Sequence, residues 1–217
     1  MEFEKLKFNF LNEKEMISRS KSFLENALKR RSVRDFSVKR VPISIIKNII
    51  KIAGTAPSGA NKQPWHFVLV KKKSLKKQIR ESAEVEEKHF YNHRASKEWL
   101  RDLDQFKTDW NKPFLEKAPY LIVVFKKVYD LKGDKKNKNY YVNESVGIAC
   151  GFLLMAIHRF GLVSLPHTPS PMGFLEKILN RPKNEKAFLL IPVGYPSKKT
   201  VIPKLKKKSF EEICDVM

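Results

Sequence analysis

The sequence has few cysteines and no long hydrophobic run. Its 217 residues include only Cys150 and Cys214, which have neither the spacing of a zinc motif nor the density of a disulfide framework. We expect both to be free thiols in a reducing compartment. The longest apolar run, residues 146–157, is shorter than the roughly 20 residues that span a bilayer. The N-terminus also lacks the apolar segment of a signal peptide, so the sequence predicts a cytoplasmic protein without membrane association.

Acidic residues are scarce relative to basic ones. The chain has 23 Asp and Glu against 44 Lys and Arg, a formal net charge of +21. Such a charge would suit a nucleic-acid-binding protein. The lysines are dispersed, however, over residues 71–73, 132–138, 198–199 and 204–208, and no RNA-binding aromatic motif, zinc finger or helix-turn-helix pattern accompanies them. We therefore favour a solvated basic surface, which attracts small anions, over a nucleic-acid role.

Several catalytic and metal-binding signatures are missing. His89 and His93 have the i, i+4 spacing of two zinc ligands on a helix. No HExxH glutamate and no third ligand lies near them in sequence, so we expect no metal site. No Gly-rich phosphate loop, no Ser-His-Asp order and no carboxylate pair typical of a glycosidase is present. Cys150 stands among apolar residues and is expected to be a core residue rather than a nucleophile.

The length of 217 residues suits one domain, or one domain with appendages. Hydrophobic periodicity predicts its helices and strands. Helices are expected over residues 13–29, from Pro42 to Ala53, from a Ser74 cap to about Tyr91, and over 144–160 and 174–179, and strands over 66–70, 120–125, 162–165 and 187–193. Residues 92–113 are polar and aromatic and are expected to be a mobile segment rather than a core element. Residues 130–139 are expected to be a charged loop. The tail, residues 197–217, has too few apolar residues to pack on itself, so we expect it to wrap onto another surface.

Residues 53–65, A-G-T-A-P-S-G-A-N-K-Q-P-W, form a distinctive loop between a predicted helix and a predicted strand. Gly54, Gly59 and the alanines leave room for a flat group to approach the backbone. Upstream, R-R-S-V-R at 30–34 places three guanidinium groups within five residues. A flat apolar seat beside an arginine cluster suits a ligand with a planar ring and a phosphate. The alternative is an ordinary helix end and turn beside a solvated basic patch.

Five segments occur in a fixed order along the chain. They are R-R-S-V-R at 30–34, A-G-T-A-P-S-G-A at 53–60, Y-Y-V-N-E at 140–144, I-A-C-G at 148–151 and P-V-G-Y-P-S-K at 192–198. Together they resemble the nitroreductase superfamily, and within it the iodotyrosine deiodinase branch, from about residue 20 to the C-terminus. The resemblance implies an α+β fold with a mixed β-sheet sandwiched by helices. It also implies a single domain over residues 1–217, a domain-swapped homodimer joined by the tail at residues 197–217, and FMN bound at the subunit interface.

The resemblance also implies which residues bind FMN. Arg30, Arg31, Ser32, Val33 and Arg34 would hold the phosphate and ribityl chain, Pro57, Ser58 and Gly59 of the partner subunit would lie against the isoalloxazine, and Pro166, His167 and Thr168 would lie near its reactive edge. The Thr168 hydroxyl would be the catalytic group, hydrogen-bonded to flavin N5 and favouring single-electron steps. Lys207 stands where the family has a phosphate-binding arginine, and a lysine supplies charge without the bidentate fork.

A substrate clamp follows from the same resemblance. Glu87 and Tyr91 are four residues apart and share a helical face, and Lys112 follows at the spacing of the branch. Glu87 can accept a hydrogen bond from an α-ammonium, while Lys112 and Tyr91 can donate to an α-carboxylate. The backbone N–H of Ala60 would meet the phenolate oxygen, and residues 87–112 would close as a lid. The alternative is an exposed, charged helix face.

The sequence therefore predicts an FMN-dependent oxidoreductase that reductively dehalogenates halogenated tyrosines. NAD(P)H or a separate reductase would supply the electrons. A second hypothesis is a broad-specificity nitroreductase or quinone reductase that uses NAD(P)H on the same fold. A third is a flavin-free basic binding protein, which a colourless preparation that cannot be reconstituted with FMN would favour.

Overall fold

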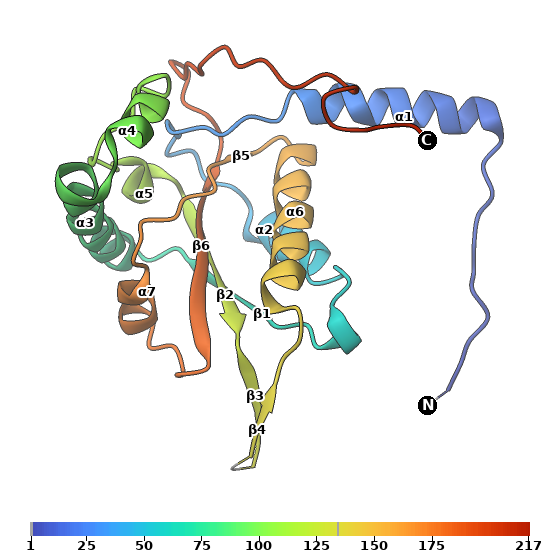
Figure 1. Ribbon diagram of the computed structural model, residues 1–217, viewed down its shortest axis with the longest axis horizontal. Helices are drawn as coiled ribbons and strands as arrows, with labels where there is room; N and C mark the ends of the chain where they lie inside the picture. Colours follow the sequence, from blue (N-terminus) through green and yellow to red (C-terminus); the bar gives the residue numbers. More distant parts are fainter. Residues whose placement is uncertain (1, 134) are drawn as a thin grey trace. The chain divides into compact units, whose positions relative to one another are not determined.

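The computed structural model describes residues 2–133 and 135–217. The chain divides into two compact units, and the boundary in the sequence lies between Arg30 and Arg31. The first unit contains one helix, α1 (Glu13–Leu28) (Figure 1). Asn12 begins it with a capping box: its side chain accepts the Glu15 N–H at 2.9 Å, and the Glu15 carboxylate accepts the Asn12 N–H at 3.4 Å. The predicted first helix is therefore confirmed to within one residue.

A four-stranded antiparallel sheet lies at the centre of the second unit (Figure 1). Its strands stand in the order β1 (Trp65–Val70), β2 (Tyr120–Lys127), β6 (Glu185–Gly194) and β5 (Val163–Ser164). The pairings between these strands are all antiparallel. An isolated parallel bridge joins Ser32 to Ser164 beside β5, and the mixed character that the resemblance implied rests on this bridge alone. The two central strands, β2 and β6, are long apolar runs because helices cover both faces of the sheet.

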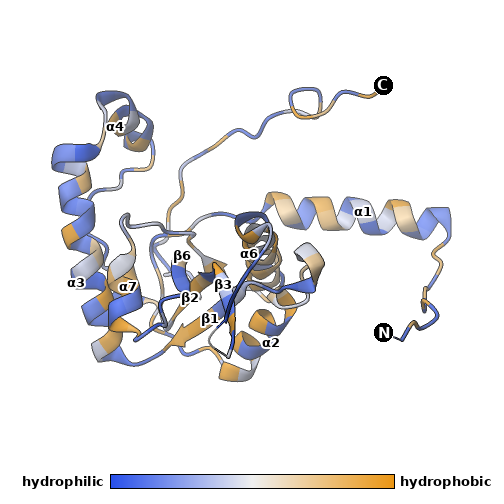
Figure 2. Cartoon of the chain, turned by 60° about the horizontal axis from the view of Figure 1, so that its bottom comes forward, coloured by the Kyte–Doolittle hydropathy of each residue, from blue (hydrophilic) through white to orange (hydrophobic). Residues whose placement is uncertain are grey.

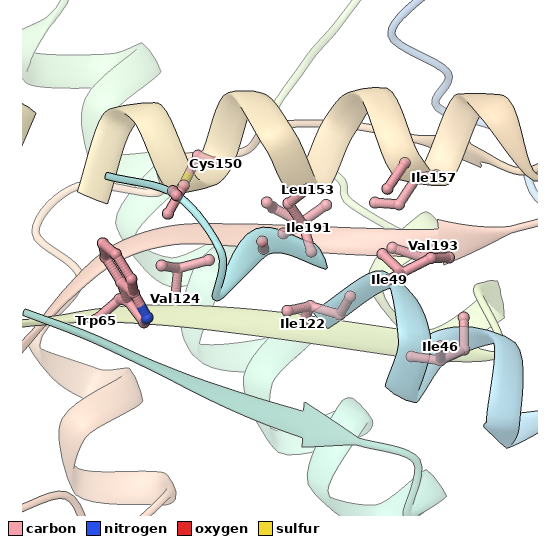
Figure 3. Close-up of a cluster of buried hydrophobic side chains, with 14 of the residues drawn as sticks. Ile46, Ile49, Trp65, Ile122, Val124, Cys150, Leu153, Ile157, Ile191 and Val193 are labelled. Atoms are coloured by element: carbon pink, nitrogen blue, oxygen red, sulfur yellow. The ribbon is translucent and has the colours of Figure 1, made fainter. Parts of the chain in front are cut away.

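Alternation along β2 divides the core into two layers. Ile122 and Val124 point to the face covered by α2 (Ile43–Ala53) and α6 (Val142–Arg159), shown in Figure 3. Leu121, Val123 and Phe125 point to the face covered by α3 (Lys73–His89), α5 (Phe114–Lys117) and α7 (Gly173–Ile178). Figure 2 shows hydrophobic residues gathered on the sheet and on the sides of the helices that face it. The α+β sandwich is therefore confirmed.

Three local predictions need correction. The α3 helix begins at Lys73 after Lys72, whose side chain makes no capping bond, so Ser74 is not the cap. Residues 92–113 contain the end of the π-helix η2 (Phe90–Arg94) and the helix α4 (Lys97–Asp104). α4 has no buried residue and lies outside the core, as expected, whereas Lys112 near the end of this segment is buried. The predicted charged loop is instead an antiparallel hairpin of β3 (Tyr129–Lys132) and β4 (Lys135–Lys138).

The end of α6 is confirmed, and the wrapping of the tail onto another surface stays a prediction. Gly161 follows α6 with φ of +74°, the left-handed conformation that ends a helix and favours glycine. The tail after β6 forms no further helix or strand, and its apolar residues Val201, Phe210 and Ile213 are exposed. Across the described residues, no helix combines the length and apolarity needed to cross a membrane.

Candidate functional site

A cavity of about 290 Å³ collects seven of the sixteen site residues that the sequence indicated. Its lining comes from the segment after Arg31, from α3, η2, α4 and α5, and from the stretch before α7: Arg34, Glu87, Phe90, Tyr91, Trp99, Leu103, Thr108, Lys112, Phe114, Leu165, Pro166, His167, Thr168 and Ser170. The whole predicted clamp, one predicted phosphate-binding arginine and the predicted Pro-His-Thr segment therefore share one cavity.

Glu87 and Lys112 form an ion pair in the wall of this cavity. Glu87 Oε2 lies 3.1 Å from Lys112 Nζ, and the two side chains are 11% and 4% exposed. The ammonium also donates to Thr108 Oγ1 at 3.3 Å and to the Asp109 carbonyl. Burial raises the pKa of Glu87 and lowers the pKa of Lys112, and in each case the partner's charge opposes the shift. The site thus holds one carboxylate and one ammonium, both largely removed from water.

The backbone of Lys112 is fixed by a second acidic residue of α3. Glu84 Oε1 accepts the Lys112 N–H at 2.7 Å and the Arg80 Nε–H at 2.7 Å. Arg80 also donates to Asn111 Oδ1 at 3.1 Å and to Glu116 Oε2 at 3.3 Å. The sequence interpretation missed Glu84 and Arg80, since their i, i+4 spacing resembles that of any solvated pair on a helix surface.

Tyr91 lies beside the ion pair. Its hydroxyl donates to the Thr108 carbonyl at 3.1 Å, and its ring centroid is 5.4 Å from Lys112 Nζ. Burial raises the pKa of Tyr91, so the hydroxyl stays protonated and remains a hydrogen-bond donor. Glu87 in α3 and Tyr91 in η2 both reach the cavity, as the i, i+4 spacing predicted.

His167 is held by the sheet and has an unpartnered ring nitrogen. Its backbone exchanges hydrogen bonds with Leu190 of β6 at 3.0 and 2.9 Å, and its ring packs edge-on against Phe114 at 5.5 Å. Burial, followed by the charges of Lys112 and Arg34, lowers the pKa of His167 to about 3. The imidazole is therefore neutral, and its buried Nε2 lies 3.7 Å from Glu87 Oε1 without a hydrogen bond to any described residue. Because buried polar atoms are normally paired, this nitrogen indicates a site that receives a polar ligand.

The three arginines of residues 30–34 separate in the structure. Arg34 lines the cavity, with its guanidinium carbon 5.4 Å from the Phe106 ring centroid. The Arg31 guanidinium donates instead to the Pro203 carbonyl in the tail. Arg30 is the last residue of the first unit, and its contact with the phosphate stays a prediction. Arg34 is therefore the arginine of this motif that the second unit brings to the cavity.

Ser32 and Val33 fix the position of Arg34. Ser32 forms the parallel bridge to Ser164, and the Val33 N–H donates to the Ser164 carbonyl at 3.1 Å. Val33 is buried, as expected for a residue that alternates with Arg34 along an extended segment. These two residues anchor the segment to the sheet edge.

The predicted seat for the flavin ring lies elsewhere on the same chain. Pro57, Ser58 and Gly59 line a separate hollow of about 210 Å³ at the beginning of α6. The Gly59 N–H donates to Ser145 Oγ at 3.4 Å, and a Cβ at Gly59 would lie only 2.9 Å from the Tyr141 ring, so this position favours glycine. That the partner subunit places these residues against the flavin ring stays a prediction.

Two further predicted residues also lie outside the cavity lining. Ala60 follows Gly59 in η1 (Gly59–Asn61) with φ of 48°, and Lys207 is exposed in the tail.

His89 and His93 stack with ring centroids 5.0 Å apart, and the part of the chain that the structure describes contains no group of three or more His, Cys, Asp or Glu able to hold a metal ion. Both cysteines are free thiols, Cys150 buried and Cys214 exposed.

Comparisons with known proteins agree on one family. The model of the Nitroreductase family matches residues 27–195. The chain is 58% identical over 195 residues to the iodotyrosine deiodinase of Haliscomenobacter hydrossis, covering 89% of this chain and 88% of that protein. It is 46% identical over 207 residues to iodotyrosine deiodinase 1 of Homo sapiens, covering 94% of this chain and 72% of that protein. A crystal structure of oxidized iodotyrosine deiodinase bound to FMN and 3-iodo-L-tyrosine aligns with a TM-score of 0.75 at 36% identity, covering 90% of this chain and 96% of that one.

Proposed function

The chain belongs to the nitroreductase family, and we propose that it is an FMN-dependent reductive dehalogenase that converts iodotyrosine to tyrosine and iodide. The similarity to iodotyrosine deiodinases over nine-tenths of the chain supports this reaction. The observation that carries the choice of substrate is the buried pair of Glu87 and Lys112 in the cavity wall. This pair offers one charge of each sign, which is what the amino-acid end of a halotyrosine requires.

A zwitterion can enter such a pair without leaving a charge unmatched. We propose that Glu87 accepts a hydrogen bond from the α-ammonium and that Lys112 donates to the α-carboxylate. The Tyr91 hydroxyl would turn from the Thr108 carbonyl and donate to the same carboxylate. Four alternating charges then replace two, so the ligand's charges are compensated when they leave water. A nitroarene or quinone has neither charge and would be recognised by its ring alone. The clamp therefore favours an amino acid over the substrates of a broad reductase.

The cavity also fits the FMN that this function requires. Arg34 offers a guanidinium for charge-assisted bonds to a phosphate, and the unpartnered Nε2 of His167 offers an unused polar atom. We propose that Arg31, Ser32 and Arg34 hold the phosphate and ribityl chain and that Thr168 hydrogen-bonds the flavin edge. When bound, FMN supplies the two electrons that, with one proton, replace the carbon–iodine bond by a carbon–hydrogen bond and release iodide.

We further propose a homodimer in which the partner supplies residues 57–60. The support is that these residues line a hollow apart from the clamp, while Ile148 and Phe152 leave apolar surface exposed on α6. In this arrangement the Ala60 N–H would reach the substrate phenolate, and Lys207 of the tail would add charge near the phosphate. Closure of residues 87–112 over the substrate would exclude water.

The electron donor and the compartment follow as expectations. NAD(P)H or a separate reductase would reduce the flavin, and two free cysteines suit a reducing compartment such as the cytoplasm. The proposal on the reaction does not depend on either point, since a chemical reductant can replace the donor in vitro.

The test is an anaerobic assay with the purified, FMN-loaded protein. After reduction with dithionite, one equivalent of 3-iodotyrosine should yield iodide and tyrosine in equal amounts. In the oxidised protein, quenching of flavin fluorescence should show that 3-iodotyrosine binds at least about thirtyfold more tightly than iodophenol, a difference of about 2 kcal/mol. NAD(P)H-dependent reduction of nitroarenes without iodide release would instead support the broad-specificity reductase.

A further inference from the structure

Two glutamates of helix α3 contact Lys112, one at its backbone N–H and one at its ammonium. Glu84 Oε1 accepts its backbone N–H at 2.7 Å, and Glu87 Oε2 lies 3.1 Å from its ammonium. The Lys112 carbonyl is bound as well, by the Leu115 N–H at 3.0 Å. Glu84 and Glu87 are three residues apart, so they project from neighbouring turns of one helix face. Two carboxylates of one helix thus fix the backbone N–H and the side-chain ammonium of Lys112.

Arg80 fixes Glu84 in turn. Its Nε lies 2.7 Å from Glu84 Oε1, in a pair whose side chains are 30% and 16% exposed. The same guanidinium reaches Asn111, next to Lys112, and Glu116 in α5. The Glu116 contact is more exposed and therefore weaker. These bonds connect α3 to Asn111, to Lys112 and to Glu116.

We propose that Glu84 is a positioning residue for substrate recognition, which sets the separation between the Lys112 ammonium and the Glu87 carboxylate before the ligand arrives. This inference rests on the proposed function. Neither Glu84 nor Arg80 is among the described residues that line the cavity, so Glu84 acts through the backbone of Lys112 and does not touch the ligand. A recognition group works only when its supporting residues hold its geometry. Glu84 therefore determines how well the site selects a zwitterion.

The same helix provides a matched control. Lys77 and Glu81 form another i, i+4 pair one turn earlier, with Nζ and Oε1 3.8 Å apart and side chains 65% and 60% exposed. This pair has the helical spacing and charges of the Arg80–Glu84 pair. Among the described interactions it makes no contact with the Lys112 backbone. Removing Glu81 thus reproduces the loss of helical charge without the loss of positioning.

The experiment compares Glu84→Ala, Glu84→Gln and Glu81→Ala in the full-length, FMN-loaded protein. Flavin fluorescence gives the dissociation constants of 3-iodotyrosine and iodophenol, and FMN affinity and the Tm are measured in parallel. Glu84→Ala should weaken 3-iodotyrosine about tenfold, because the Lys112 N–H loses its buried acceptor, and should change iodophenol less than about twofold. Glu84→Gln keeps an acceptor oxygen and should recover most of the loss. Glu81→Ala should match the wild type.

Other outcomes overturn the inference. Unchanged discrimination in Glu84→Ala, or equal losses for both ligands, would mean that Glu84 is structural. If Glu84→Ala does not fold, Arg80→Met takes its place: a selective loss of several-fold for 3-iodotyrosine supports the inference, and wild-type discrimination overturns it. A wild type that does not prefer 3-iodotyrosine over iodophenol would overturn the proposed function, and this inference with it.

Discussion

The ion pair of Glu87 and Lys112 should be coupled in the free energy of unfolding. Lys112→Met keeps a stem of similar length but removes the ammonium that is paired with the Glu87 carboxylate in the cavity wall. Glu87→Gln leaves Lys112 with two oxygen partners, Thr108 Oγ1 and the Asp109 carbonyl. The double variant carries no charge at either position. Together with the wild type, these three variants form a double-mutant cycle, which measures the interaction free energy between Glu87 and Lys112.

The expected magnitudes follow from the burial of the two side chains, 4% and 11% exposed. Leaving one partner of a buried pair alone costs about 3–5 kcal/mol. Burial already raises the pKa of Glu87, so proton uptake limits the cost of Lys112→Met to about 2–3 kcal/mol near neutral pH. Glu87→Gln should cost about 1–2 kcal/mol. The double variant should lie within about 1 kcal/mol of the wild type, because no charge remains buried.

Urea unfolding followed by circular dichroism, at fixed protein and FMN concentrations, measures these differences. The loss in Lys112→Met should shrink as the pH is lowered, because a carboxyl group whose folded pKa is raised binds its proton more readily in the folded state. All three variants should bind 3-iodotyrosine at least about thirtyfold more weakly and iodophenol almost normally. The exposed pair Lys77–Glu81, replaced in the same way, should show no coupling beyond about 0.5 kcal/mol.

Additive effects would refute this account. If the double variant is destabilised by the sum of the single variants, then Glu87 and Lys112 do not pair in the ligand-free protein. A loss in Lys112→Met that does not change with pH would show that Glu87 is not the group left unpaired.

Three further predictions concern the cofactor, the pH dependence and the sheet. Arg34→Ala should weaken FMN binding about tenfold to a hundredfold, since a phosphate loses a charge-assisted donor worth about 1.5–3 kcal/mol; fluorescence titration of the FMN-free protein measures it, and unchanged affinity would remove Arg34 from the phosphate site. The pKa of His167 falls from 6.5 to about 3 on folding, so the unfolded chain binds the extra proton between these values and stability is lost as the pH falls through this window. Urea unfolding should therefore show that the wild type loses about 2 kcal/mol more than His167→Asn between about pH 7.5 and about pH 5; equal losses would contradict a buried neutral imidazole. Gly194→Ala should lower stability by about 1–3 kcal/mol, because its Cβ would lie 2.5 Å from Cδ of the Pro119 ring; a Tm equal to that of the wild type would show that the ring can move.

The core was predictable because its residues repeat with the period of their elements. The apolar run of β2 contributes to both layers of the sandwich, and the isoleucines of α2 contribute to one. The β3–β4 hairpin was not predictable, because Lys135–Lys138 has the composition of a solvated loop. It forms because β3 follows β2 almost directly and Gly133, with φ of +60°, adopts the turn conformation. Here tertiary context decides over local propensity.

The candidate site also contains residues that the sequence predicted and residues that it did not. Glu87, Tyr91 and Lys112 were identified by the resemblance, and the structure brings them to one cavity. Glu84 and Arg80 were missed, because nothing in an i, i+4 pair shows that one of its oxygens also binds the backbone of a residue 28 positions away. Sequence patterns within a helix indicate which residues share a face. They do not indicate which loop folds onto that face.

In the proposed dimer, the loop at residues 57–60 would complete the site of the neighbouring chain. Each chain has a cavity with a charge clamp and an arginine, and a separate hollow formed by the small residues of this loop. In the twofold dimer proposed above, the loop of each subunit would lie against the cavity of the other. Each of the two sites would then combine the cavity of one subunit with the loop of its partner. FMN would then contact both subunits and bind only the associated form. By mass action, such a ligand stabilises the association that creates its site. The small residues that make the loop a seat for a flat ring would therefore act on the neighbouring chain.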